Sequence, residues 1–121
     1  MSRKSQILLV DDEKPCLDSL KMILEMEDYD VLDAENAVDA RTLLQETDAC
    51  SPALAIVDYA LSGEENGDSL AKFLLESMPT IEVIIASGYH FPANLSHERL
   101  HFLAKPFNSE RLLKLVKYYA A

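Results

Sequence analysis

The stretch Ile7-Leu8-Leu9-Val10-Asp11-Asp12 joins four consecutive apolar residues to a pair of carboxylates. An apolar run of this length is typical of a strand buried on both faces, as in a parallel sheet that is covered by helices. Leu54-Ala55-Ile56-Val57-Asp58 repeats the arrangement farther along the chain. Because ligands and chemistry in such sheets gather beyond the carboxyl ends of the strands, we expect the acids of both stretches to share one site.

Outward from these two stretches, strand-like runs alternate with amphipathic stretches of helical length. Further strands are expected at 29–32, 81–86 and 102–104, and helices from residue 15, over 36–46, from residue 67 to before residue 79, over 94–100, and after residue 108. This alternation predicts an α/β fold, a flavodoxin-like doubly wound (βα)5 parallel sheet in three α/β/α layers. The expected strand order is 2-1-3-4-5, which makes the first and third strands neighbours and leaves the more polar 29–32 at an edge.

Length and composition indicate one compact domain over residues 1–121, and we expect no output domain in this chain. The net charge of −10 opposes direct binding to nucleic acid or anionic lipid. No apolar run approaches the length of a membrane span. Cys16 and Cys50 cannot form a disulfide framework, and no secretory leader precedes the first apolar run, so we expect a cytoplasmic protein.

Two more polar groups follow strand-like runs: Ser87 follows Val83–Ala86, and Lys105 follows Phe102–Ala104. At the expected edge of the sheet, a hydroxyl and an ammonium would therefore join three carboxylates. Two carboxylates about 4 Å apart repel by about 4 kcal/mol at an effective dielectric constant near 20. A hard divalent cation relieves this repulsion, and the oxygen ligands suit Mg²⁺.

The ordered set Ile7–Glu13, Leu54–Asp58, Ala86-Ser87-Gly88-Tyr89 and Lys105-Pro106-Phe107 closely resembles the receiver domain of two-component response regulators. The resemblance covers essentially the whole chain. It implies that Asp58 is the phosphoacceptor, that Asp11, Asp12, Asp58 and the backbone carbonyl of Ala60 hold Mg²⁺, and that Ser87 and Lys105 contact the phosphoryl group. It also implies that Ala60 and Tyr89 tune the rate of dephosphorylation.

The same resemblance implies a signalling domain that catalyses its own aspartyl phosphorylation and dephosphorylation and is not a turnover enzyme in the usual sense. Its partners would be a sensor histidine kinase or a histidine phosphotransfer protein, a downstream protein target or output domain, and a second copy after phosphorylation. Ser87 and Phe102 would form the switch that remodels the face made by the helix over 94–100, the strand over 102–104 and the last helix. Phe102 lacks the hydroxyl that receivers often carry there, so we expect its ring to favour the inward position.

Several alternatives stay open at this point. Asp11 and Asp12 could cap the first helix, Ser87 could satisfy backbone groups at a strand end, and Phe102 could be an ordinary core residue. The bond before Pro106 could be cis or trans. Residues 62–67 make the loop after Asp58 one residue longer than in many receivers. The chain could also be a phosphorylation-independent interaction module of the receiver type.

Overall fold

The computed structural model of the protein describes residues 5–46, 52–61, 66–88 and 96–120. Strands and helices alternate along the chain for most of its length. The strands are β1 (Gln6–Val10), β2 (Asp30–Ala34), β3 (Leu54–Asp58), β4 (Glu82–Ser87) and β5 (Leu100–Ala104). The helices are α1 (Lys14–Met26), α2 (Ala37–Glu46), α3 (Gly67–Ser77) and α4 (Ser109–Tyr119).

The five strands form one parallel sheet in the order β2-β1-β3-β4-β5, which confirms the predicted fold class and strand order. The more polar β2 lies at an edge, as expected. The register pairs Val10 with Val57, and Asp58 with Ala86, so the carboxyl ends of β1, β3 and β4 lie level with one another. The first and third strands are neighbours, which places the two acidic stretches side by side.

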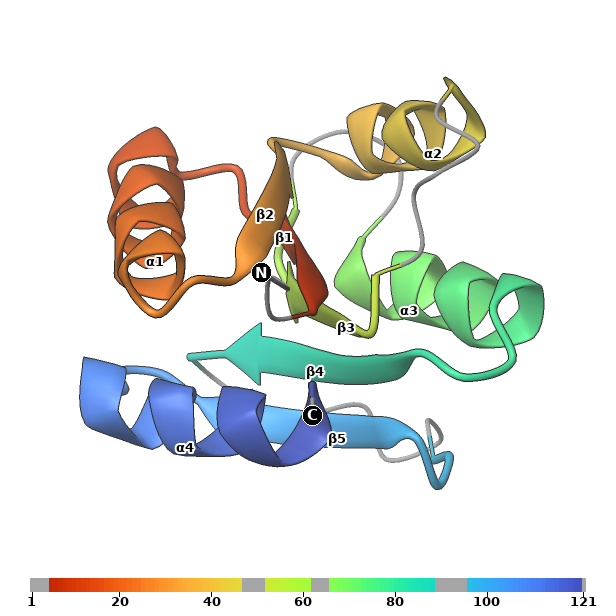
Figure 1. Ribbon diagram of the computed structural model, residues 1–121. Helices are drawn as coiled ribbons and strands as arrows, with labels where there is room; N and C mark the ends of the chain where they lie inside the picture. Colours follow the sequence, from red (N-terminus) through yellow and green to blue (C-terminus); the bar gives the residue numbers. More distant parts are fainter. Residues whose placement is uncertain (1–4, 47–51, 62–65, 89–95, 121) are drawn as a thin grey trace.

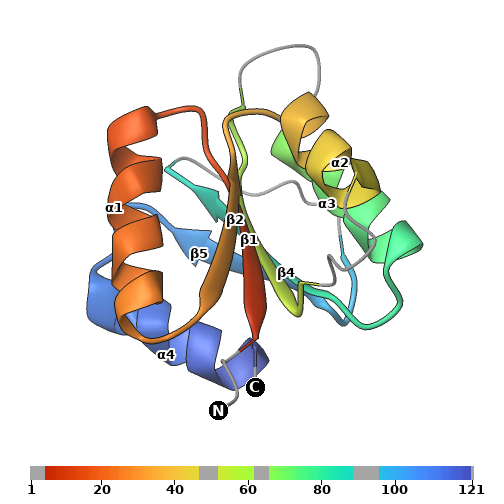
Figure 2. The ribbon, with the colours of Figure 1, turned by 45° about the horizontal axis from the view of Figure 1, so that its top comes forward.

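Among the residues that the structure describes, two helices cover each face of the sheet, and each face has its own hydrophobic core. Helices α1 and α4 cover one face, and α2 and α3 cover the other (Figures 1 and 2). Alternate residues of the buried strands serve the two cores: Leu8 and Val57 pack with α2 and α3, whereas Leu9 and Ile56 pack with α1 and α4. This alternation explains why the central strands read as continuous apolar runs.

Local sequence signals account for the starts of the helices. Asn108 caps α4 by accepting a hydrogen bond from the backbone N–H of Arg111 at 2.8 Å. Asn66 caps α3 through the N–H of Ser69 at 3.3 Å, and Pro15 lies in the first turn of α1. Within the described ranges, no helix combines the length and apolar character needed to cross a membrane.

The prediction of a helix over 94–100 is wrong for residues 96–100, the part of it that the structure describes. Residues 96 and 97 have no regular structure, residues 98 and 99 form a turn, and residues 94 and 95 lie outside the described ranges. Leu100 begins β5, where it pairs with Val83 and is 6% exposed. The guanidinium of Arg99 donates hydrogen bonds to the carbonyls of Leu75, Met78 and Ile81 at 2.8–2.9 Å. These contacts tie the segment to the end of α3 and to the sheet, which outweighs a weak helical pattern.

The apolar residues Val38, Leu43 and Leu44 predict the buried side of α2, and the structure differs from this prediction for Val38. Val38 is 66% exposed, while Ala37 and Ala40 are buried, and Leu43 is only partly buried. Ala37 and Ala40 pack in the core on the side of α2 that faces the sheet, and Val38 lies on the outer side. The sequence alone did not determine which side of α2 is buried, because alanine and valine are both compatible with a buried position.

Candidate functional site

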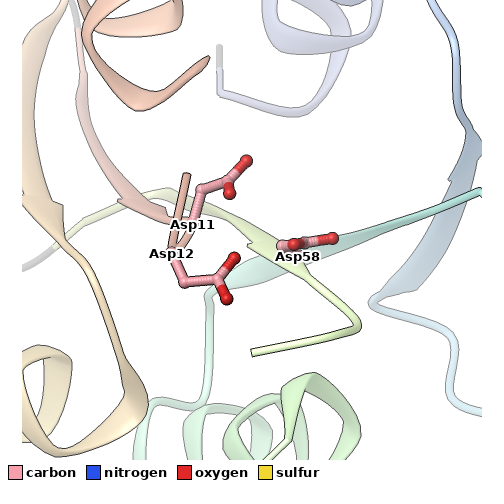
Figure 3. Close-up of side chains that lie close together, drawn as sticks. All are labelled: Asp11, Asp12 and Asp58. Atoms are coloured by element: carbon pink, nitrogen blue, oxygen red, sulfur yellow. The ribbon is translucent and has the colours of Figure 1, made fainter. Parts of the chain in front are cut away.

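Three carboxylates meet at the carboxyl ends of β1 and β3. Asp11 and Asp12 follow the last residue of β1, Asp58 is the last residue of β3, and one oxygen from each lies within 4.8 Å of the other two (Figure 3). Asp11 and Asp58 are buried, with 5% and 7% of their surfaces exposed, and Asp12 is more exposed. The arrangement offers a set of hard oxygen donors, which suits Mg²⁺.

Lys105 provides positive charge beside both buried carboxylates, Asp58 and Asp11. Its Nζ donates a hydrogen bond to Oδ1 of Asp58 at 3.0 Å and lies 3.9 Å from Oδ2 of Asp11. Lys105 follows β5 directly, and its backbone N–H donates to the carbonyl of Ser87 at 2.8 Å. The Lys105–Pro106 peptide bond, whose isomer the sequence left open, is cis.

The electrostatics of the site follow from burial and from these neighbours. Burial raises the pKa of the Asp11 carboxyl, and the charges of Asp58 and Asp12 add to that rise against the opposing effects of the Glu13 N–H and Lys105. Burial alone would lower the pKa of Lys105, but the hydrogen bond to Asp58 and the charges of Asp58 and Asp11 raise it. Lys105 is therefore a firmly charged ammonium beside a crowded group of acids.

The alternative role of Asp11 and Asp12 as helix caps is not what the structure shows. The residue at the N-cap of α1 is Glu13, and its side chain makes no capping hydrogen bond. Asp11 does accept the backbone N–H of Glu13 at 2.9 Å, which fixes one of its oxygens. Its other oxygen is the one that faces Lys105.

The hydroxyl-bearing residue and the residues around Asp58 are held by the sheet. Ser87, the last residue of β4, is 5% exposed and lies opposite Ala104 in the register, next to Lys105. The N–H of Tyr59 donates to the carbonyl of Ala86 at 2.9 Å, so the chain leaving Asp58 is tied to β4. Ala60 follows in an exposed loop. The rate-tuning position Tyr89 and the longer loop at 62–65 lie outside the described residues.

Phe102 does not take the inward position that we expected. Its side chain lies on the same side of β5 as Leu100, yet Phe102 is 36% exposed. Leu100 belongs to the core beneath α2 and α3, and Phe102 does not. Phe102 therefore lies partly exposed on the edge strand β5.

Gly67 is a site residue whose role the sequence reading missed. A Cβ at this position would lie 2.3 Å from the carbonyl oxygen of Asp58 and 2.7 Å from Cα of Tyr59. Its own N–H donates to the carbonyl of Tyr59 at 2.8 Å. A glycine at the first position of a helix, a few residues after a candidate phosphoacceptor, is the signal that could have indicated this close approach.

The sequence profile of the response regulator receiver domain matches residues 7–117. The chain belongs to this family. It is therefore a receiver domain of the response regulators of two-component systems. Receiver domains are signalling domains, so the expected class of protein is confirmed at this level.

Among curated proteins, the receiver domain is 31% identical over 118 residues to the sensory transduction protein LytT of Bacillus subtilis, covering 94% of this chain and 47% of that protein. It is 32% identical over 116 residues to the nitrogen assimilation regulatory protein NtrX of Azorhizobium caulinodans, covering 92% of this chain and 25% of that protein. The chain thus spans about half the length of LytT, or less in the case of NtrX.

Solved receiver structures show the same fold. A CheY-like receiver domain protein from Methanospirillum hungatei superposes with a TM-score of 0.76 at 29% identity, covering 95% of this chain and 92% of that one. A response regulator receiver protein from Sinorhizobium medicae gives a TM-score of 0.84 at 22% identity, with 97% and 94% covered. The second likeness bears on the fold alone.

Proposed function

We propose that Asp58 accepts a phosphoryl group and that the resulting acyl phosphate switches the domain between two binding states. The observation that carries this proposal is the meeting of three carboxylates, within 4.8 Å of one another, with an ammonium 3.0 Å from Asp58. A purely structural role for Lys105 does not require two further carboxylates beside its partner Asp58. A phosphoryl-transfer role requires both kinds of charge.

Asp11, Asp12, Asp58 and the backbone carbonyl of Ala60 would hold Mg²⁺. The donor set supports this assignment, since Mg²⁺ favours carboxylate and carbonyl oxygens and keeps several water ligands. When bound, the ion would neutralise charge on the phosphoryl oxygens and on the clustered acids.

The residues of the chain perform the remaining steps. A carboxylate oxygen of Asp58 attacks phosphorus, a new P–O bond forms, and the bond from phosphorus to the donor breaks with its electron pair leaving on the donor. Lys105 would leave Asp58 to pair with a phosphoryl oxygen, and the hydroxyl of Ser87 would donate a hydrogen bond to another. Hydrolysis of the acyl phosphate would reset the site, at a rate tuned by Ala60 and Tyr89.

The switch would connect this chemistry to the far side of β5. Movement of Ser87 toward the phosphoryl group would open space for Phe102 to rotate inward from the partly exposed position that it occupies here. The face near β5 and α4 would change with it. Partners of this face would be a downstream target, an output domain or a second copy, and the donor would be the phosphohistidine of a sensor kinase or phosphotransfer protein.

The test is mass analysis of intact protein after incubation with phosphoramidate and Mg²⁺. The proposal predicts one added phosphoryl group on the wild type, none on Asp58→Asn, and none on the wild type when a chelator removes Mg²⁺. An unmodified wild type under all donor conditions would favour a phosphorylation-independent interaction module instead.

A further inference from the structure

Arg99 binds three backbone carbonyls at the end of the sheet that lies away from the acidic site. One nitrogen of its guanidinium donates hydrogen bonds to the carbonyls of Met78 at 2.9 Å and Ile81 at 2.8 Å, and another donates to the carbonyl of Leu75 at 2.9 Å. Leu75 lies in the last turn of α3, and the other two lie in the connection from α3 to β4. Carbonyls in the last turn of a helix have no partner within the helix, so the guanidinium caps this end of α3.

The backbone of Arg99 joins the same region to the start of β5. Its carbonyl accepts the N–H of Val83 at 2.8 Å, and its N–H donates to Nδ1 of His97 at 3.0 Å. Leu100, the next residue, lies opposite Val83 in the register of β4 and β5. Arg99 is therefore held through both its side chain and its backbone at the point where β5 begins.

The rest of β5 fixes its register only weakly. Among the described residues, β5 pairs with β4 alone, because it is the last strand in the order of the sheet. Only Leu100 and Leu103 of its five residues are buried. The buried face of a strand specifies its register, and here that face is small. A slip by two residues would also keep each side chain on its own side of the sheet, since side chains alternate along a strand.

The register of β5 decides where Lys105 lies. Lys105 follows β5 directly, its N–H donates to the carbonyl of Ser87 at 2.8 Å, and its Nζ lies 3.0 Å from Asp58. A slip of two residues would move Lys105 by about 7 Å along the sheet, which would break both contacts. The same slip would draw Arg99 away from carbonyls that belong to α3 and to the turn before β4. The contacts of the guanidinium thus belong to the register that brings Lys105 to Asp58.

We propose that Arg99 is a positioning residue for phosphoryl transfer, which acts through the register of β5 on Lys105. Its guanidinium meets the three carbonyls when Leu100 lies opposite Val83, and that register sets the ammonium of Lys105 at Asp58. Arg99 does not touch the reacting atoms. Its role in transfer rests on the function proposed above, in which Lys105 pairs with a phosphoryl oxygen, whereas its effect on the register does not depend on that function.

Hydrogen exchange tests the register without any phosphoryl donor. In Arg99→Gln, the amide of Lys105 should exchange about tenfold faster than in the wild type or more, because hydrogen bonds to a charged group are lost. Amides of β1 serve as the reference for global unfolding. Arg41→Gln is the matched control, since this guanidinium lies 4.1 Å over the ring of Phe73 and touches α3 without β5. It should keep the wild-type rate at Lys105. Faster exchange at Leu100 with no change at Lys105 would overturn the proposal.

Arg99→Lys keeps the proposal testable if Arg99→Gln does not fold. An ammonium lacks the planar fork with which the guanidinium reaches three carbonyls, so this variant keeps the charge and loses part of the contacts. The amide of Lys105 should exchange faster in Arg99→Lys than in the wild type. Wild-type exchange at Lys105 in this variant would overturn the proposal.

Phosphorylation kinetics test whether Arg99 acts through Lys105. With Mg²⁺ and saturating phosphoramidate, Arg99→Gln should lower the rate of Asp58 modification by about tenfold or more, as expected of a misplaced charge. In a Lys105→Gln background the same change should have no further effect, because the two residues act as one unit. Equal losses in both backgrounds would indicate a loss of folded protein and would overturn the proposal. Absence of modification in the wild type would overturn the proposed function and the role in transfer, and the effect on the register alone would stand.

Discussion

Lys105 is held between two carboxylates that a divalent cation would also use. Its Nζ is 3.0 Å from Asp58 and 3.9 Å from Asp11, and a quarter of its side chain is exposed. The ammonium relieves part of the repulsion in the acidic group. It also repels any cation that approaches those acids. Lys105 therefore stabilises the protein without metal and weakens the binding of a metal ion.

This opposition gives a prediction for Lys105→Gln. Removing the positive charge should tighten Mg²⁺ binding by about tenfold, since two charges at this separation interact by several kcal/mol before solvent screening reduces the effect. Phosphorylation of Asp58 should become slower in the same variant. Calorimetric titration with Mg²⁺ measures the affinity, with Lys114→Gln on the exposed side of α4 as the control. Weaker Mg²⁺ binding in Lys105→Gln would show that the sign is wrong.

The raised pKa of Asp11 predicts how stability without metal depends on pH. Burial, the largest cause, and the neighbouring acids favour the protonated carboxyl in the folded state. A group whose folded pKa is raised adds stability below its unfolded pKa, and that stability is lost as the pH rises through the folded pKa. In chelator, the wild type should therefore gain stability relative to Asp11→Asn as the pH falls from neutral toward this pKa.

Urea unfolding of the two proteins at a series of pH values makes the measurement. The difference between them isolates Asp11 from the other carboxyl groups, which titrate in both. A difference that stays constant with pH would mean that Asp11 titrates normally.

At the scale of elements, the start of α3 is fixed against the strand that carries Asp58. Gly67→Ala should lower the free energy of unfolding by about 2–3 kcal/mol, because its Cβ would lie 2.3 Å from the backbone oxygen of Asp58. At an ordinary helix position the same change is stabilising. Gly88→Ala is the matched control, since its Cβ would meet Lys105 Cβ at 3.9 Å, an ordinary contact. Denaturant unfolding of both variants decides, and equal stabilities would exclude the close approach.

The central strands β1, β3 and β4 were predictable because their apolar runs are continuous and because polar residues end them. All five appear in the expected order, with bounds that shift by one or two residues. The prediction of a helix over 94–100 was wrong because its apolar pattern was weak and because Leu100 is buried as part of the sheet. The prediction that Val38 is buried was wrong because Ala37 and Ala40 occupy the buried side of α2. In both cases a tertiary contact outweighed the local pattern.

The site was partly predictable for a similar reason. Residues that follow strands in a parallel sheet converge whatever their side chains are, so Asp11, Asp58 and Lys105 could be grouped from the sequence. The contact of Gly67 with Asp58 could not be inferred, because it depends on how closely the start of α3 approaches the sheet. Sequence periodicity gives the buried side of a helix and leaves that distance undetermined.

At the scale of the whole molecule, a chain with a net charge of −10 gathers three of its acids at one edge of the sheet. Mg²⁺ should therefore stabilise the folded protein. At 100 times the dissociation constant, a ligand of the folded state adds about 2.7 kcal/mol, which corresponds to a rise of about 10 °C in Tm for a domain of this size. Thermal unfolding with MgCl₂, compared with NaCl at equal ionic strength, measures the effect.

Asp12→Asn is the control for this stabilisation, because it removes the more exposed acid and leaves the two buried ones. Its rise in Tm with Mg²⁺ should be clearly smaller than that of the wild type. Equal rises in the two proteins would indicate general screening of negative charge and would argue against a specific metal site.

In the proposed reaction Asp58, and no other carboxylate of the acidic group, receives phosphorus. Borohydride reduction of the phosphorylated protein converts an aspartyl phosphate to homoserine, and peptide mass analysis then identifies the position. We predict homoserine at residue 58 alone, formed only when Mg²⁺ and a phosphoryl donor are both present. Homoserine at residue 11 or 12, or at no position after complete reaction with donor, would contradict the account.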